Sequence, residues 1–223
     1  MKRVVFYVPK GGAGTTTLAA LFAWHAARSG IPTVAVSVDL SGHLLRVLGQ
    51  ETTFSLDALS KVEPNLWVTY APQEVPDVRA FSSECTPELL VVDAKCGSGI
   101  RIEEADLLLA PISEIQALRN LVSLHKRGAL SAVRTMLSLN RQSFENDLSA
   151  AAACAVYENP SLELHPVALC EAASIRRVTE AGRCLWDLPH RQSWSSRCVA
   201  RWADSLRAQL FSTERQRFTR VTD

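Results

Sequence analysis

Long hydrophobic runs are absent from this sequence of 223 residues. No apolar stretch approaches the roughly 18 residues that a membrane-spanning helix needs. The apolar run Val4–Val8, which follows two basic residues near the N-terminus, is too short for the hydrophobic region of a secretory signal. We therefore expect a soluble, cytoplasmic protein, and stable insertion into a membrane is not expected.

Closely spaced cysteines, internal repeats, low-complexity tracts and linkers are also lacking. The six cysteines form no C-x-x-C pair, and no histidine lies at zinc-ligand spacing from them, so we expect reduced and mostly buried thiols. A chain of this length can bury one compact core, and we expect a single domain over residues 1–223. The cysteines are Cys85, Cys96, Cys154, Cys170, Cys184 and Cys198.

Charge is unevenly distributed, although the net charge is only +1. The segment from Ser174 to Asp223 contains ten arginines and five acidic residues, which gives +5, and residues 1–173 have −4 by difference. A basic end of this kind fits a solvated helix face, a nucleic-acid patch or a partner surface. The arginines are Arg176, Arg177, Arg183, Arg191, Arg197, Arg201, Arg207, Arg215, Arg217 and Arg220.

The same segment predicts a basic amphipathic helix over about 191–211, because its apolar residues recur at three- and four-residue spacing. We expect this helix to dock on the rest of the protein rather than to bind lipid. The residues of its apolar face are Trp194, Cys198, Val199, Trp202, Leu206 and Leu210, and arginines 197, 201 and 207 lie elsewhere.

Short apolar runs alternate with helical or loop segments along most of the chain. An alanine-rich helix is predicted over Thr16–Ser29, and Gly30 is placed to end it. Strands that alternate with helices predict an α/β fold with a mostly parallel, doubly wound sheet and helices on both faces. The predicted strands are Val4–Val8, Thr33–Val38, Leu66–Tyr70, Leu89–Val92, Leu107–Ala110, Met136–Leu139 and Leu162–Val167.

A glycine-rich stretch, Pro9-Lys10-Gly11-Gly12-Ala13-Gly14-Thr15-Thr16-Thr17, joins the first strand to the first helix. Glycines at such a place let successive backbone N–H groups converge on phosphate oxygens, and the helix N-terminus adds its positive end. A hydroxyl at Thr16 or Thr17 can ligate the magnesium ion that accompanies a nucleotide. A tight turn without a ligand is the alternative, and the position between strand and helix favours phosphate binding.

The usual phosphate loop has a lysine after its last glycine, where this sequence has Thr15, and Lys10 precedes the paired glycines instead. This arrangement resembles the deviant Walker A loop of the ParA/MinD family. The resemblance implies binding of ATP and Mg²⁺ and a homodimer that sandwiches the nucleotide, with Lys10 reaching the partner's phosphates. It assigns the magnesium ligand to Thr16, and the phosphate cradle to Gly11, Gly12, Ala13, Gly14, Thr15, Thr16 and Thr17.

Further motifs along the chain resemble the same family. Asp39, in V-D-L-S-G-H-L, falls where the family has the segment D-P-Q-G-N-L that orients the attacking water, although Ser37 replaces the first aspartate of its D-x-D pair. L-V-V-D resembles the Walker B strand and makes Asp93 a magnesium-associated carboxylate. L-N-R places Asn140 in the adenine pocket. An aspartate or asparagine at a strand end is otherwise a common cap or turn residue.

Within the family the loop is locally most similar to BcsQ-type proteins of bacterial cellulose secretion, which share G-G-x-G-T-T-T, an Ala-Trp pair matched by Ala23-Trp24, and an N-L-L-R run matched by residues 43–46. This resemblance implies a regulator or spatial organiser of a larger assembly, with weak ATPase activity and a protein partner that recruits it to the inner membrane.

Two other functions remain open. The arginine-rich end would suit a plasmid or chromosome partition ATPase that grips nonspecific DNA at the nucleoid. Thr15 removes a charge-assisted contact to phosphate, which would suit a scaffold that binds nucleotide poorly.

Overall fold

The computed structural model describes residues 1–9, 12–39, 41–50, 58–72, 85–95, 104–130, 133–141, 147–170, 173–187 and 193–212. The strands are β1 (Lys2–Val8), β2 (Thr33–Ser37), β3 (Ser60–Glu63), β4 (Leu66–Tyr70), β5 (Leu89–Lys95), β6 (Leu107–Ile112), β7 (Thr135–Leu139) and β8 (Leu162–Leu164). The helices are α1 (Thr15–Arg28), α2 (His43–Val47), α3 (Ile115–Lys126), α4 (Leu148–Glu158), α5 (Ala173–Glu180), the 3-10 helix η3 (Leu185–Asp187) and α6 (Trp194–Phe211).

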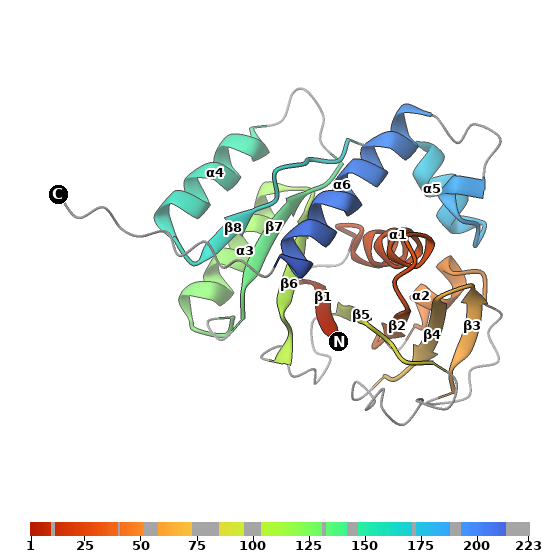
Figure 1. Cartoon of the computed structure of the whole chain (residues 1–223). Coiled ribbons are helices and arrows are strands. Elements are labelled where there is room, and N and C mark those ends of the chain that lie inside the picture. The colour runs from red at the N-terminus through yellow and green to blue at the C-terminus, as the bar shows by residue number, and fades with distance from the viewer. Residues whose placement is uncertain are drawn as a thin grey trace.

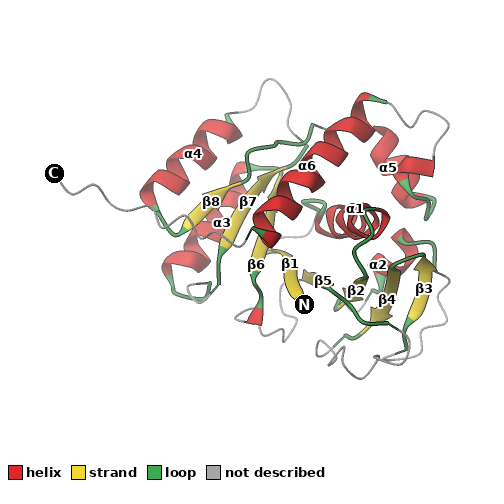
Figure 2. Cartoon of the chain, in the orientation of Figure 1, coloured by secondary structure: helices red, strands yellow, loops and turns green. Residues whose placement is uncertain are grey.

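The described strands form an eight-stranded sheet in the order β3-β4-β2-β5-β1-β6-β7-β8. Every neighbouring pair is parallel except β3 and β4, which run antiparallel at one edge. Helices lie on both sides of this sheet (Figures 1 and 2). The α/β fold with a mostly parallel, doubly wound sheet is therefore confirmed.

Each face of the sheet has its own apolar core, because successive side chains of a strand point to opposite sides. Phe6 of β1 packs on one face with α1, α2, α5, η3 and α6. Its neighbour Val5 packs on the other face with α3 and α4. The central strands are buried on both faces, which is why their sequences are continuous apolar runs rather than alternating ones.

All seven predicted strands are present; β4 has the predicted bounds, and no end of the other strands differs from the predicted one by more than three residues. Strand β3, which has the sequence Ser-Lys-Val-Glu, is not among the predicted strands. Charged residues are typical of an exposed sheet edge because they hinder pairing with another chain. Because two of its four residues are charged, β3 does not form an apolar run that would predict a strand.

Helix α1 ends as the sequence predicts. Gly30 adopts a left-handed conformation with φ of 85° and donates its N–H to the Ala27 carbonyl at 2.9 Å. The N–H of Ile31 reaches back to the Ala26 carbonyl at 3.1 Å. This pair of bonds is a Schellman cap, which satisfies carbonyls that the helix itself leaves without partners.

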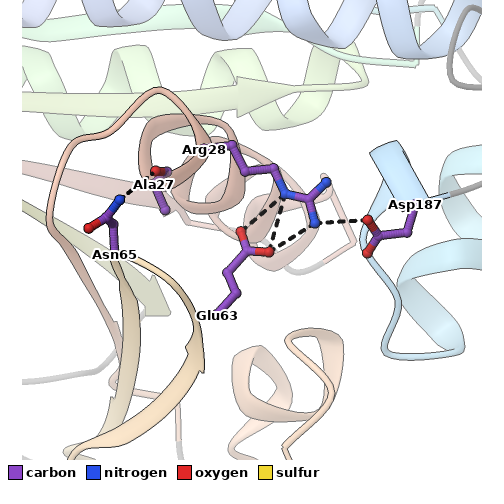
Figure 3. A network of polar contacts seen from close by, with 5 residues as sticks. All are labelled: Ala27, Arg28, Glu63, Asn65 and Asp187. Atoms are coloured by element: carbon purple, nitrogen blue, oxygen red, sulfur yellow. Dashed lines mark hydrogen bonds and ion pairs between the residues drawn. The ribbon is translucent and has the colours of Figure 1, made fainter.

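Just before this cap, Arg28 ties the end of α1 to two other elements (Figure 3). Its guanidinium donates to both carboxylate oxygens of Glu63 on β3, at 2.9 to 3.2 Å, and to Asp187 of η3 at 2.9 Å. The neighbouring Asn65 amide donates to the carbonyl of Ala27 at 3.4 Å. The far end of α1 is thereby anchored to the antiparallel edge of the sheet.

Helix α6 lies where the C-terminal amphipathic helix is predicted, and it docks on the sheet through Trp202. The Trp202 ring is fully buried, packs edge-on against Phe22 at 6.2 Å, and donates its indole N–H to the Ser138 hydroxyl at 3.0 Å. The prediction for Trp194 is wrong, because this residue is 55% exposed. Trp194 is the first residue of the helix, and the buried residues of α6 begin only at Ser196.

The cysteines are less buried than predicted. Among the five that the structure describes, all free thiols, Cys85 and Cys184 are buried, Cys170 and Cys198 are half-buried, and Cys154 is exposed. Burial raises the pKa of the Cys184 thiol to about 12, so this thiol stays protonated at neutral pH. None of the helices in the described part of the chain is both long and apolar enough to span a bilayer.

His165 is 3% exposed, and its ring lies against Trp202 at 6.1 Å, so burial lowers its pKa below 6.5. A lowered pKa means that the unfolded chain binds the proton more readily than the folded protein. The free energy of unfolding should therefore decrease as the pH falls below about 6.5. Urea unfolding at pH 7.5 and pH 5.5 measures this loss.

The control for this prediction is His165→Gln, which has no titratable group at the site. Its free energy of unfolding should change less between the two pH values than that of the wild type. An equal change in both proteins would show that other groups cause the acid sensitivity.

Candidate functional site

The glycine-rich loop leaves the carboxyl end of β1 and enters α1. Gly12 and Gly14 have φ values of +92° and +88°, a left-handed region that side chains disfavour. Ala13 lies between them, is 3% exposed, and packs with Val8 and Ala117. The loop is thus pinned to the core at its middle residue, while Lys10 and Gly11 lie outside the described residues.

The start of α1 has no side-chain cap, because its N-cap residue is Gly14. The first hydrogen bond of the helix runs from the Leu18 N–H to the Gly14 carbonyl at 2.9 Å. The N–H groups of Thr15, Thr16 and Thr17 precede it and have no partner within the helix. By contrast, the Ser193 hydroxyl caps α6. The positive end of α1 is therefore arranged to meet an anion.

Asn140 braces the loop from the end of β7. Its side-chain amide donates to the Ala13 carbonyl at 2.7 Å, and its backbone N–H donates to the Ile112 carbonyl at 2.8 Å. The side-chain oxygen accepts the N–H of Arg141 at 3.0 Å. The resemblance to the ParA/MinD family implies a place for Asn140 in the adenine pocket, which stays a prediction. The hydrogen bond from Asn140 to the loop is an additional role that no local pattern reveals.

The contact between Asn140 and the loop is tight enough to exclude a side chain at Gly14. A Cβ atom on Gly14 would lie 2.5 Å from the amide nitrogen of Asn140, whereas a Cβ atom on Gly12 would have no atom of the described residues within 4 Å. The backbone beside Gly12 is therefore open to a ligand, and the backbone at Gly14 is closed by the protein.

Two carboxylates lie at the same edge of the sheet as the loop. Asp93 is 2% exposed and pairs in register with Phe6 of β1 and Ser37 of β2. Asp39 lies two residues after the end of β2 and is half-buried. The N–H of Val38 beside it donates to the Asp93 carbonyl at 3.2 Å. The parallel topology therefore brings both aspartates to the carboxyl ends of the central strands.

This set of groups fits a nucleotide with its magnesium ion. Backbone N–H groups suit phosphate, and the Thr16 hydroxyl and the Asp93 carboxylate are the oxygen ligands that Mg²⁺ prefers. Within the described ranges no group of three or more histidine, cysteine, aspartate and glutamate side chains could hold a metal ion by itself. A metal here would take its remaining ligands from phosphate and water, as Mg²⁺ commonly does.

Comparison with known proteins identifies the architecture. No protein-family model and no curated protein sequence matches the chain. Among solved structures, a chain of the MinC:MinD cell division protein complex of Aquifex aeolicus is similar over 96% of this chain and 99% of its own, with a TM-score of 0.74 and 19% identity. The chain therefore has the fold of the MinD and ParA P-loop ATPases.

Two other structures with this fold have bound nucleotides. The septum site-determining protein MinD of Pyrococcus horikoshii, in complex with Mg-ADP, covers 92% of this chain and 95% of its own, with a TM-score of 0.69 and 17% identity. A plasmid partition protein of Borrelia burgdorferi, bound to AMPPNP, covers 94% and 99%, with a TM-score of 0.64 and 11% identity. At identities this low, the structural similarity shows a common fold and no more.

The two loop glycines offer a matched pair of substitutions. Gly12→Ala should lower the free energy of unfolding by about 1 to 2 kcal/mol, because its left-handed backbone disfavours a side chain. Gly14→Ala should cost about 1 kcal/mol more, because the new methyl group displaces the Asn140 amide from Ala13. Urea unfolding of both variants measures the difference.

The same substitutions in an Asn140→Ala background test the cause. With the amide removed, Gly12→Ala and Gly14→Ala should have equal costs, and the double-mutant cycle should show coupling only for Gly14. Equal costs in the wild-type background would contradict the contact between Gly14 and Asn140.

Proposed function

We propose that the chain binds ATP with Mg²⁺ at the loop between β1 and α1 and forms a homodimer around the nucleotide. The observation that carries this proposal is the loop itself. Gly12 and Gly14 turn the backbone into a left-handed path, the start of α1 has no side-chain cap, and Asn140 holds the loop in place. Such a structure presents several N–H donors to one anion.

In this proposal each group at the site has a separate task. The backbone from Gly11 to Thr17 cradles the phosphates, and the Thr16 hydroxyl and the Asp93 carboxylate hold the magnesium ion. Asp39 orients the attacking water. The ion supplies charge neutralisation for the phosphates when it is bound.

Thr15 makes hydrolysis slow in this proposal. A lysine at that position would add a charge-assisted hydrogen bond to phosphate, worth about 2 kcal/mol. Thr15 is the first residue of α1, so its N–H can still serve the cradle. Lys10 of the second subunit supplies the missing positive charge, which makes nucleotide binding and dimerisation interdependent.

The wider role that we propose is to organise or regulate a larger assembly through a partner protein. The loop sequence and the 43–46 run support a BcsQ-type component of bacterial cellulose secretion. The structural neighbour from Aquifex aeolicus was itself solved as a complex of MinD with MinC. A fold of this kind can therefore present a surface to a partner.

A partition ATPase that binds nonspecific DNA is the second candidate, and the surface of α5 and α6 favours it. Exposed arginines are Arg176 and Arg177 on α5, Arg183 shortly after it, and Arg197 and Arg201 on α6. Clustered guanidinium groups suit a salt-dependent grip on the phosphate backbone.

A scaffold that binds nucleotide poorly is the third candidate, and Thr15 and Ser37 favour it. These residues stand where the resembled family has a lysine and an aspartate.

Sedimentation of the purified protein with and without ATP and Mg²⁺ tests the main proposal. ATP should convert the wild type from monomer to dimer, and Lys10→Ala should remain a folded monomer, because it lacks the charge that braces the partner's phosphates. A dimer fraction that Lys10→Ala leaves unchanged would contradict the role of Lys10.

A third sedimentation sample, which contains ATP, Mg²⁺ and a nonspecific DNA duplex, distinguishes between the three candidate functions. Co-sedimentation that needs ATP and falls steeply with salt would favour partition. The absence of any shift would favour the scaffold.

Thr15→Lys restores the usual residue and should tighten ATP binding about 10- to 30-fold if the loop has the usual geometry. Titration calorimetry of the wild type and the variant measures this gain. Ser29→Lys is a control, since it adds the same charge at the exposed far end of α1, outside the phosphate cradle. An equal gain in both variants would indicate a nonspecific charge effect.

A further inference from the structure

The turn after β2 holds the carboxylate of Asp39 by both oxygens. The backbone N–H of Ser41 donates to one oxygen at 3.2 Å, and the Ser41 hydroxyl donates to the other at 2.6 Å. The carbonyl of Asp39 accepts the N–H of Gly42 at 2.9 Å. Ser41 thus holds both oxygens of the aspartate side chain.

Ser41 is in turn held by a side chain from α2. The guanidinium of Arg46 donates to the Ser41 carbonyl at 2.9 Å. This bond spans the first turn of α2. It therefore links the position of the Asp39 turn to the position of the helix. Since α2 has only five residues, the bond from Arg46 adds to the few backbone bonds that join this turn to the helix.

The backbone that follows the carboxyl end of α2 packs closely against the turn after α5. A Cβ atom on Gly49 would lie 2.6 Å from the Gly182 carbonyl oxygen, and a Cβ atom on Gly182 would lie 2.9 Å from the Arg46 carbonyl oxygen. Both glycines also have positive φ values, of 75° and 61°. This backbone contact, together with the buried Leu44, fixes the place from which Arg46 reaches the turn.

We infer that Ser41 and Arg46 are positioning residues for Asp39. This inference rests on the proposed function, in which Asp39 orients the water that attacks the nucleotide. An aspartate on a loop samples several rotamers, and only a narrow range of them places an oxygen against a water at a fixed site. Ser41 selects the orientation of the carboxylate, and Arg46 holds Ser41 in the place that makes this selection possible.

Three substitutions separate positioning from general damage. Ser41→Ala removes the hydroxyl donor and keeps the backbone donor. Arg46→Met removes the guanidinium and keeps the unbranched stem, whereas Arg46→Lys keeps a cationic donor. The matched control is Arg127→Met, since Arg127 is an exposed arginine just after α3, at the end of that helix remote from the loops that follow β1 and β2. Thermal melting first shows that each variant is folded.

The readouts are the affinity for a fluorescent ATP analogue and the kcat and KM of phosphate release with Mg-ATP. Ser41→Ala and Arg46→Met should each lower kcat about 10-fold and leave the affinity and KM within about twofold, since neither residue belongs to the phosphate cradle. Arg46→Lys should restore most of the rate, and Arg127→Met should match the wild type.

Other outcomes overturn the inference in distinguishable ways. Rates of Ser41→Ala and Arg46→Met that equal the wild-type rate would show that Asp39 needs neither residue. A rate of Arg46→Lys as low as that of Arg46→Met, or a loss of affinity that accounts for the whole effect, would assign Arg46 a structural role. A wild type that binds the analogue but releases no phosphate would remove the step that Asp39 serves. A wild type that binds no analogue would overturn the proposed function itself.

Discussion

The hydrogen bond from the Asn140 amide to the Ala13 carbonyl joins segments 127 residues apart, and the shape of the candidate site depends on it. The bond is possible because β6 alone separates β1 from β7 in the sheet. The loop after β1 and the residue after β7 therefore emerge at the same edge, one strand apart. A glycine loop left to itself would sample many conformations. The strand order places Asn140 beside the loop, and its hydrogen bond to Ala13 restricts the loop to one conformation.

Helix α1 connects the loop to the antiparallel edge of the sheet. It starts at the loop and ends at Arg28, where the guanidinium bonds to Glu63 and Asp187. The Arg28 side chain is 34% exposed, so solvent screens these ion pairs, and each contributes little free energy by itself. Their geometric effect is larger, because a planar guanidinium bound to two carboxylates fixes both direction and distance. Both ends of the helix are thus held by side chains from distant segments.

Most of the fold could be predicted from the sequence, because a parallel sheet covered on both faces produces apolar runs. The strand around Val91 and the strand around Leu108 are recognisable for that reason. Edge elements obey other constraints. Lys61 and Glu63 keep β3 polar at the border of the sheet, and Trp194 begins α6 beyond the contact with the sheet. The helical spacing of Trp194 is correct, but spacing alone does not show where a helix meets its neighbour.

The candidate site was predictable only where its residues lie near strand ends. Asp39 lies two residues after β2, and Asp93 lies inside β5, two residues before its end. The pattern of aspartate followed two residues later by serine and then glycine is a local signal of the Ser41 turn. The contact of Gly49 with Gly182 joins α2 to distant backbone, so no local pattern contains it. The bond from Arg46 to Ser41 spans only five residues, but it depends on how α2 and the turn are placed, which residue spacing does not show.

Shape and charge at this site are separable. Gly12, Gly14 and Asn140 determine the path of the loop without any charged group, while Thr15 begins the helix and contributes its N–H whatever its side chain is. Replacement of a lysine by Thr15 therefore leaves the shape of the cradle intact and lowers its positive charge. In the function that we propose, the shape of the loop provides selectivity for a phosphate chain, and its affinity depends on the cations that other groups bring to it.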